Sequence, residues 1–165
     1  MSSVELGIDM GMDLGLSSLS PQRQILLQNV LKLYSCLGSK QLVRDVYSDN
    51  DVSEFSFEDP LSHAIGWKQV VAQWIGLKKV FYNSSTESVK ILENSESTIR
   101  FELVQKYNFN THKSKTIKSL VILELTENDK VLIHKDLWNF KELSKWSHFF
   151  RRINAKLIKL RYYKH

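Results

Sequence analysis

Cysteine and long apolar runs are both scarce in this sequence. The 165 residues contain one cysteine, Cys36, which excludes an internal disulfide. Cys36 falls inside a helical apolar stretch, so the pattern favours a buried, inert thiol over a catalytic one. No apolar run approaches the roughly 18 residues that a membrane span needs. We therefore expect a reducing compartment for this chain, the cytoplasm or the nucleus.

Signals for targeting, metal binding and phosphate binding are missing as well. The start, MSSVELGIDMGMDLGL, carries three acidic residues and no Lys or Arg, which argues against a secretory signal and a mitochondrial presequence. The five histidines show no paired metal-ligand spacing, and the chain has neither a glycine-rich phosphate loop nor a GxSxG motif. We therefore expect no metal and no cofactor.

Positive charge is concentrated at the C-terminal end. Residues 141–165 hold eight Lys and Arg against one acidic residue, a charge of +7 in a chain whose total is +5. The other 140 residues are therefore slightly acidic, and the pI near 9.2 describes a basic tail on an acidic domain.

Apolar periodicity divides the chain into three parts. Residues 1–19 are rich in Gly, Ser and Asp and poor in aromatics, so we expect them to be disordered. Residues 20–140 predict one domain, and residues 141–165 predict a basic amphipathic helix. Within the domain, helical spacing predicts helices at 20–38, 39–46 and 66–78, and alternation predicts strands at 55–58, 86–93, 98–108, 114–125 and 131–138.

The segment FSFEDPLSHAIGW, residues 55–67, carries the most specific signal. Its two phenylalanines alternate with polar residues, as in a strand with one apolar face. Asp59-Pro60 ends that strand because proline cannot donate to the ladder, and Gly66-Trp67 opens a new helix. This segment and the order of the elements resemble the nuclear transport factor two-like superfamily with its cystatin-related cone, and within it the fungal SigF-like and SnoaL-like proteins.

The resemblance covers residues 20–140 and implies an α+β fold. In this fold a cone-shaped, curved antiparallel sheet packs on three helices from the N-terminal half of the chain. The basic helix at the C-terminus would be an addition to it. A meander of strands joined by tight polar turns agrees with this architecture.

The same resemblance implies a pocket between the concave sheet face and the helices. It places Asp59 and His63 at the mouth, as base and proton carrier if the protein is an enzyme. The other pocket candidates are Trp67, Trp74, Tyr107, His134, Asp136 and Trp138.

Each of these residues also has a purely structural interpretation. Asp59 before proline suits a turn, His63 suits the surface, and two tryptophans seven residues apart on one helix face suit a core. His134 and Asp136 share one strand face, which fits either a pocket or a solvated face.

Two functional classes remain open. The first is a non-catalytic binding module that uses its pocket for a small apolar ligand, or its sheet face for a protein partner or homodimer. The alternative is a cofactor-free lyase or isomerase, SnoaL-like, acting on a small apolar molecule. The first is favoured because the His, Tyr and Asp pattern of the superfamily's dehydratases and steroid isomerases does not map here residue by residue.

The pattern of residues 141–165 predicts that the terminal helix docks on another surface. Its apolar side, with Trp146, Phe150 and Ile153, is expected to pack on the domain or a second subunit. An anionic surface or acidic partner would meet the basic residues Lys145, Arg151, Arg152, Lys156 and Lys159. Nucleic acid ranks lower because the rest of the chain is acidic and supplies no second patch.

Overall fold

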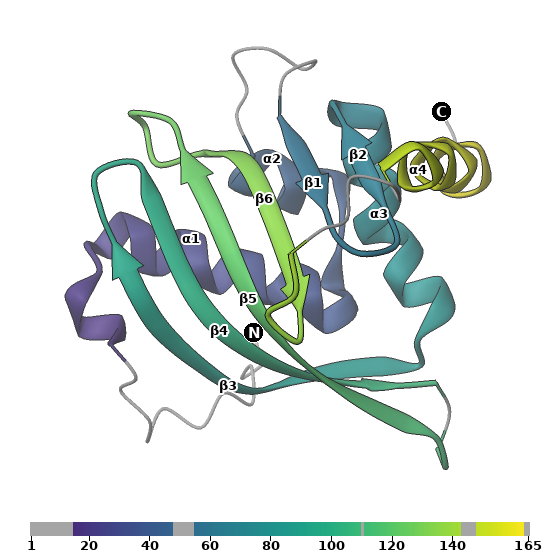
Figure 1. The fold of residues 1–165 in the computed structure, drawn as a ribbon, viewed down its shortest axis with the longest axis horizontal. Helices are drawn as coiled ribbons and strands as arrows, with labels where there is room; N and C mark the ends of the chain where they lie inside the picture. The colour runs from purple at the N-terminus through teal and green to yellow at the C-terminus, as the bar shows by residue number, and fades with distance from the viewer. Residues whose placement is uncertain (1–14, 48–54, 110, 143–147, 164–165) are drawn as a thin grey trace, which may run out of the picture.

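The computed structural model describes residues 15–47, 55–109, 111–142 and 148–163. It shows an α+β fold in which a strongly curved sheet wraps around helices on its concave side (Figure 1). The helical elements are η1 (Leu16–Ser18), α1 (Pro21–Lys32), η2 (Leu33–Leu37), α2 (Lys40–Val46), α3 (Trp67–Val80) and α4 (His148–Tyr162). The strands are β1 (Ser56–Glu58), β2 (His63–Ile65), β3 (Asn83–Asn94), β4 (Thr98–Asn108), β5 (Ser114–Leu125) and β6 (Val131–Trp138).

The six strands form one sheet in the order β2-β1-β6-β5-β4-β3. All neighbours are antiparallel except β1 and β6, which run parallel. The sheet is therefore mixed, whereas the sequence predicted an antiparallel one. The single strand expected at 55–58 is the first half of a hairpin, because the chain turns at Asp59-Pro60 and returns as β2. Two register shifts in the pairing of β3 with β4 accompany the bend of the sheet.

The predicted disordered segment 1–19 lies largely outside the described residues. From Gly15 onward the chain forms the short helix η1, and Leu19 is buried in the core. The Ser20 hydroxyl caps α1 by accepting from the Arg23 N–H, and Pro21 occupies the first helical position; both residues are typical of a helix start.

The segment η2, which continues α1, is shaped by close packing against α3. Helical geometry breaks at Ser35 and Cys36, and Cys36 adopts a left-handed φ of 62°. At Gly38, a Cβ atom would lie 2.5 Å from the carbonyl oxygen of Trp74, so only glycine lets the two segments approach this closely. The break leaves Tyr34 fully buried between helix and sheet.

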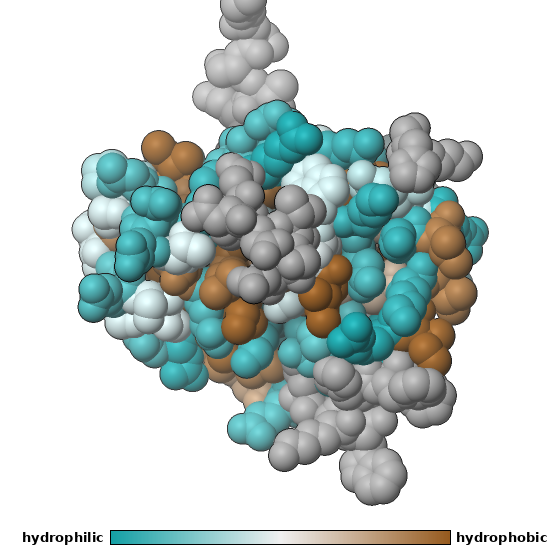
Figure 2. Space-filling view, turned by 90° about the horizontal axis from the view of Figure 1, so that it is seen from above, coloured by the Kyte–Doolittle hydropathy of each residue, from teal (hydrophilic) through white to brown (hydrophobic). Residues whose placement is uncertain are grey.

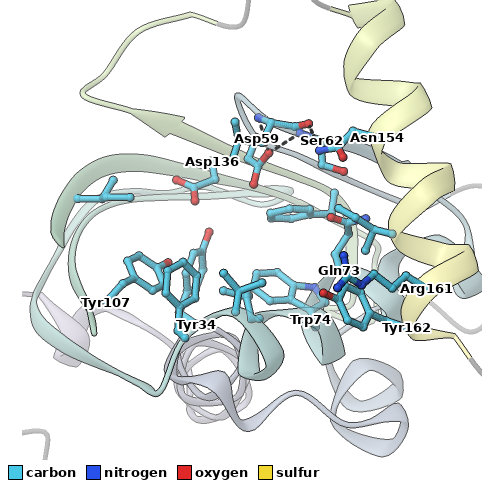
Figure 3. Close-up of a pocket in the computed structure, with 18 of the residues that line it drawn as sticks. Tyr34, Asp59, Ser62, Gln73, Trp74, Tyr107, Asp136, Asn154, Arg161 and Tyr162 are labelled. Atoms are coloured by element: carbon cyan, nitrogen blue, oxygen red, sulfur yellow. Dashed lines mark hydrogen bonds between the residues drawn. The ribbon is translucent and has the colours of Figure 1, made fainter. Parts of the chain in front are cut away.

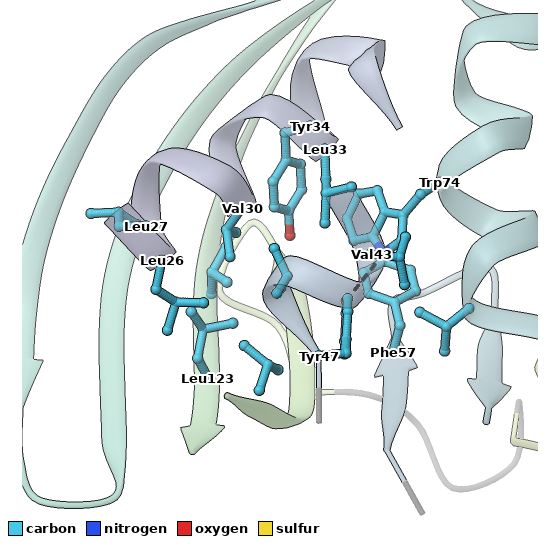
Figure 4. Close-up of a cluster of buried hydrophobic side chains, with 14 of the residues drawn as sticks. Leu26, Leu27, Val30, Leu33, Tyr34, Val43, Tyr47, Phe57, Trp74 and Leu123 are labelled. Atoms are coloured by element: carbon cyan, nitrogen blue, oxygen red, sulfur yellow. Dashed lines mark hydrogen bonds between the residues drawn. The ribbon is translucent and has the colours of Figure 1, made fainter. Parts of the chain in front are cut away.

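The core lies between the concave sheet face and α1, α2 and α3 (Figure 4). The alternation predicted for 98–108 is confirmed, because every second residue of β4 from Ile99 to Tyr107 is buried. Aromatic rings fill the centre, and Trp74 contacts both Tyr34 and Phe57.

Helix α4 packs on α3 and β2 with a face that the sequence did not predict. Arg151, expected to face solvent or an anionic partner, is buried and pairs through Nη1 with Glu58 Oε1 at 2.5 Å. Ala155 is also buried, and Gly76 of α3 leaves room for the Tyr162 ring. Ile153, expected to pack inward, is exposed.

Three other tail residues cannot be compared with the prediction. Lys145 and Trp146 lie outside the described residues, as does the side chain of Phe150. Among the helices that the structure describes, none has the length and apolarity to cross a membrane.

The two tryptophans of α3 differ in burial, which separates their expected contributions. Trp74 is 1% exposed, whereas Trp67 is only half-buried and lies under the Arg44 guanidinium. We expect Trp74→Ala to lower the free energy of unfolding by about 3–5 kcal/mol, because it opens a cavity in the core. Trp67→Ala should cost clearly less. Urea unfolding of both variants measures this, and equal losses would contradict the assignment of Trp74 to the core.

Candidate functional site

A cavity of about 450 Å³ lies between the concave face of the sheet and the helices (Figure 3). Most of its wall is apolar or aromatic, with Phe57, Leu77, Phe81, Ile117 and Trp138 among the lining residues. Helix α4 closes one side with Asn154, Leu157, Ile158, Arg161 and Tyr162. The added helix is therefore part of the cavity wall.

Asp59 lines this cavity from the turn between β1 and β2. Its Oδ1 accepts from the backbone N–H groups of Leu61 at 2.8 Å and Ser62 at 2.6 Å. Asp59 is therefore a turn carboxylate and a cavity residue at once. Burial, followed by the nearby charge of Asp136, raises the pKa of Asp59 to about 7.

Asp136 lines the same cavity from β6. Its Oδ2 accepts from the Trp138 indole N–H at 3.2 Å, while Oδ1 has no partner among the described residues. Burial raises the pKa of Asp136 to about 6, against the lowering effect of the nearby polar side chains of Ser119, Trp138 and Tyr34. Two acidic groups thus share one cavity, and their pKa values lie near neutral pH.

Unsatisfied polar atoms gather at this cavity. Four buried side-chain atoms lack a hydrogen-bond partner in the described part of the chain, and three of them belong to cavity-lining residues. These three are Ser62 Oγ, Gln73 Nε2 and Asp136 Oδ1. A buried polar group without a partner costs stability, so such atoms mark a place where a ligand's polar groups can bind.

His134 lies behind the cavity wall, at the centre of a hydrogen-bonded chain. It is fully buried; Tyr34 Oη lies 2.9 Å from its Nε2 and Tyr47 Oη lies 2.8 Å from its Nδ1. The Trp74 indole N–H donates to Tyr47 Oη at 3.1 Å. Burial lowers the pKa of His134 to about 3, so the ring is neutral and carries one proton.

The direction of this chain follows from Trp74. The Trp74 indole can only donate, so Tyr47 Oη accepts from it and the Tyr47 O–H donates to His134 Nδ1. The neutral His134 ring then carries its proton on Nε2 and donates it to Tyr34 Oη, and we assign the Nε2–H tautomer on this ground. Every donor in the chain is directed toward Tyr34, which lines the cavity, and successive bonds of this kind strengthen one another.

The structure brings most of the predicted pocket residues together. Asp59, Trp74, Tyr107, Asp136 and Trp138 line the cavity. His134 is not a lining residue and contacts the site through Tyr34.

Two predicted pocket residues lie elsewhere. His63 is in β2 and outside the cavity lining, so the expected pairing of Asp59 with His63 as base and proton carrier is not formed there. Trp67 is also outside the lining, because it starts α3 on the side that faces Arg44.

Sequence reasoning missed Tyr34, Ser62 and Gln73. By its spacing, Tyr34 belongs to the apolar side of a helix, where a core residue is expected. The one signal that could have found it is that a buried tyrosine hydroxyl needs a hydrogen-bond partner. Gln73 lies among apolar residues of α3 and is only 9% exposed. No group of three or more His, Cys, Asp or Glu that could hold a metal ion occurs among the residues that the structure describes.

The low pKa of His134 predicts a specific acid sensitivity. Below about pH 6.5 the unfolded chain protonates this histidine while the folded protein does not, so falling pH removes stability until about pH 3. Relative to His134→Gln, which cannot titrate, the wild type should lose ~3 kcal/mol between about pH 7 and about pH 4. Urea unfolding at a series of pH values measures this. A stability difference that does not change with pH would contradict a buried neutral His134.

Comparisons with solved structures identify the fold. No family model matches the sequence, and no curated protein sequence matches it. Among solved structures, a nuclear transport factor two-like protein from Anabaena variabilis is similar with a TM-score of 0.59 and 14% identity, covering 71% of this chain and 86% of that one.

Two further solved structures are similar at comparable levels. One is assigned as a SnoaL-like polyketide cyclase from Shewanella putrefaciens, with a TM-score of 0.57 and 13% identity, covering 76% of this chain and 84% of that one. The other is assigned as an isomerase of the SnoaL-like family from Agrobacterium tumefaciens, with a TM-score of 0.56 and 11% identity, covering 72% and 98%. The chain thus has the nuclear transport factor two-like cone fold that SnoaL-like proteins share.

Proposed function

We propose that this protein is a cofactor-free isomerase or lyase that moves a proton on a small apolar molecule carrying a carbonyl group. The observation that carries the proposal is the coexistence, in one apolar cavity, of two carboxyls with raised pKa values and three unsatisfied polar atoms. Proteins that share the fold and are assigned as SnoaL-like isomerases and cyclases support it.

The two carboxyls suit different roles. Asp136 has the lower pKa and an oxygen without a partner, so its ionised form is the base that accepts a proton from the carbon beside the substrate carbonyl. The electron pair of the broken C–H bond moves onto the carbonyl oxygen. Asp59 has the higher pKa and keeps its proton, which it gives to a second carbon in an isomerisation or to a leaving hydroxyl in a dehydration.

Neutral donors complete the site. The Ser62 hydroxyl and the Gln73 amide have no partner in the part of the chain that the structure describes, and they can hydrogen-bond to substrate oxygens that gain negative charge. The Tyr34 hydroxyl, which accepts a hydrogen bond from neutral His134, favours the ionised form of Asp136. The largely apolar wall lowers the local polarity, which strengthens these interactions.

The binding-module class explains the site less well. An apolar ligand alone gains nothing from a buried Asp136 and a half-buried Asp59 whose ionisation the charge of Asp136 disfavours. A carrier would be more stable with neutral residues at both positions. The arrangement therefore favours catalysis over simple binding.

Deuterium exchange on simple ketones tests the proposed base, whatever the natural substrate is. The full chain is incubated in D₂O with a panel of small cyclic and aromatic ketones, and label at the carbon beside the carbonyl is measured by mass spectrometry. We expect Asp136→Asn to slow exchange by about 10²–10⁴-fold, because the amide cannot accept the proton. Asp45→Asn, at an exposed carboxylate of α2, is the matched control and should exchange as the wild type does.

The opposite result has a clear meaning. Ketones that raise the melting temperature of the wild type without any exchange would support the binding-module class instead. Equal exchange by Asp136→Asn and the wild type would remove Asp136 from the mechanism.

The two pKa values predict a bell-shaped pH profile. Exchange should rise with pH through about 6 as Asp136 ionises, and fall through about 7 as Asp59 loses its proton and adds a second negative charge to the cavity. In Asp59→Asn, whose amide oxygen can still accept the two backbone N–H groups of the turn, the falling limb should disappear. A variant that keeps both limbs would show that Asp59 is only a turn residue.

A further inference from the structure

Helix α4 exposes an apolar stripe to solvent. Ile153, Leu157 and Leu160 are 40%, 58% and 77% exposed, and their spacing places them on one side of the helix. The opposite side holds the buried Arg151 and Ala155. The helix thus packs on the domain with Arg151, Ala155 and Tyr162, while the apolar residues of the stripe stay exposed.

Basic residues flank this stripe on both sides. Helical spacing puts Arg152, Lys156 and Lys159 along one edge and Arg161 along the other. The helix His148–Tyr162 contains no acidic residue, and these four cations form no ion pair within the described ranges. Figure 2 shows hydrophobic side chains gathered along the edge of the molecule that carries α4, beside a band of hydrophilic ones.

The stripe leads to the cavity. Leu157 and Arg161 belong both to the exposed surface of α4 and to the cavity lining. Leu61, 57% exposed in the turn beside α4, also lines the cavity, and the Asn154 amide donates to its carbonyl oxygen at 2.8 Å. The exposed apolar residues and the apolar cavity are therefore continuous around the edge of α4.

We propose that this surface docks on an anionic lipid bilayer. A narrow apolar stripe between long cationic side chains is the pattern of a helix lying in a membrane interface, where leucines enter the acyl region and Lys and Arg reach the head groups. Docking in this orientation brings the cavity edge to the bilayer, where small apolar molecules concentrate. The proposal concerns membrane binding and stands independently of the proposed reaction.

Charge argues against the two other occupants. A second copy of the chain meeting this stripe with its own would bring two sets of the same four cations together, which like-charge repulsion disfavours. An acidic protein partner needs fixed polar contacts for register, whereas the exposed surface of α4 offers flexible cations around three aliphatic side chains. A fluid anionic bilayer attracts the four cations instead of repelling them, and it requires no fixed register.

Vesicle co-sedimentation of the full chain tests the proposal. We expect binding to vesicles of phosphatidylserine and phosphatidylcholine, little binding to phosphatidylcholine alone, and weakening as salt rises. The double variant Ile153→Glu/Leu160→Glu should bind the mixed vesicles ~10-fold more weakly or worse. Neither residue lines the cavity.

Two further variants make the result specific. Ile25→Glu/Leu92→Glu changes the charge by the same amount at exposed apolar residues of α1 and β3, and should bind as the wild type does. Lys156→Gln/Lys159→Gln leaves the stripe intact and should weaken binding roughly tenfold or more, which tests the cations even if the glutamate variant fails to fold. Circular dichroism establishes that each variant is folded.

Several outcomes would overturn the proposal. One is a wild type that does not bind the mixed vesicles at low salt. Another is equal loss of binding in the α4 glutamate variant and in its matched control. A wild type that is dimeric by sedimentation velocity, and becomes monomeric in Ile153→Glu/Leu160→Glu, would assign the stripe to a second copy of the chain.

Discussion

The hydrogen bonds at both nitrogens of His134 are the constraint on which the rest of the structure depends. One tyrosine comes from η2, the other follows α2, and Trp74 of α3 adds a third helical element to the same cluster. A single buried ring on β6 thus fixes how the helices sit over the sheet. Burial keeps the ring neutral, so it needs one donor and one acceptor, and the two tyrosines supply them. The same bonds hold Tyr34, which lines the cavity together with Asp136 and so links the core to the cavity.

The cavity combines features that oppose stability with features that suit chemistry. Carboxyls with raised pKa values and unsatisfied buried polar atoms both cost folding free energy. The surrounding core offsets that cost through densely packed aromatic rings. Unsatisfied polar groups concentrated in one apolar cavity are typical of a site in which a ligand supplies their hydrogen-bond partners. This contrast between core and cavity is the physical basis of the proposed acid–base function.

Much of the fold could be predicted from the sequence, but only part of the site could. Alternation in β4 and β5 and the Pro21 and Gly38 signals mark local structure, so the elements and their order follow from neighbouring residues. The pairing of Arg151 with Glu58 joins residues far apart in the chain, and no local pattern shows that α4 would turn a basic residue inward. Gln73 and Ser62 likewise gain their meaning from the cavity around them. His134 and Asp136 could be placed on one strand face, but which side of the sheet that face occupied needed the structure.

The pKa values of Asp59 and Asp136, measured from the ¹³C chemical shifts of their carboxyl carbons, test the central claim most directly. Assignment would come from Asp59→Asn and Asp136→Asn. Two carboxyls in one cavity should both titrate well above the usual range, at about 7 and about 6, and Asp136→Asn should lower the pKa of Asp59 because it removes the nearby charge. Two independent titrations near ~3.9, the value of a solvated aspartate, would contradict the account.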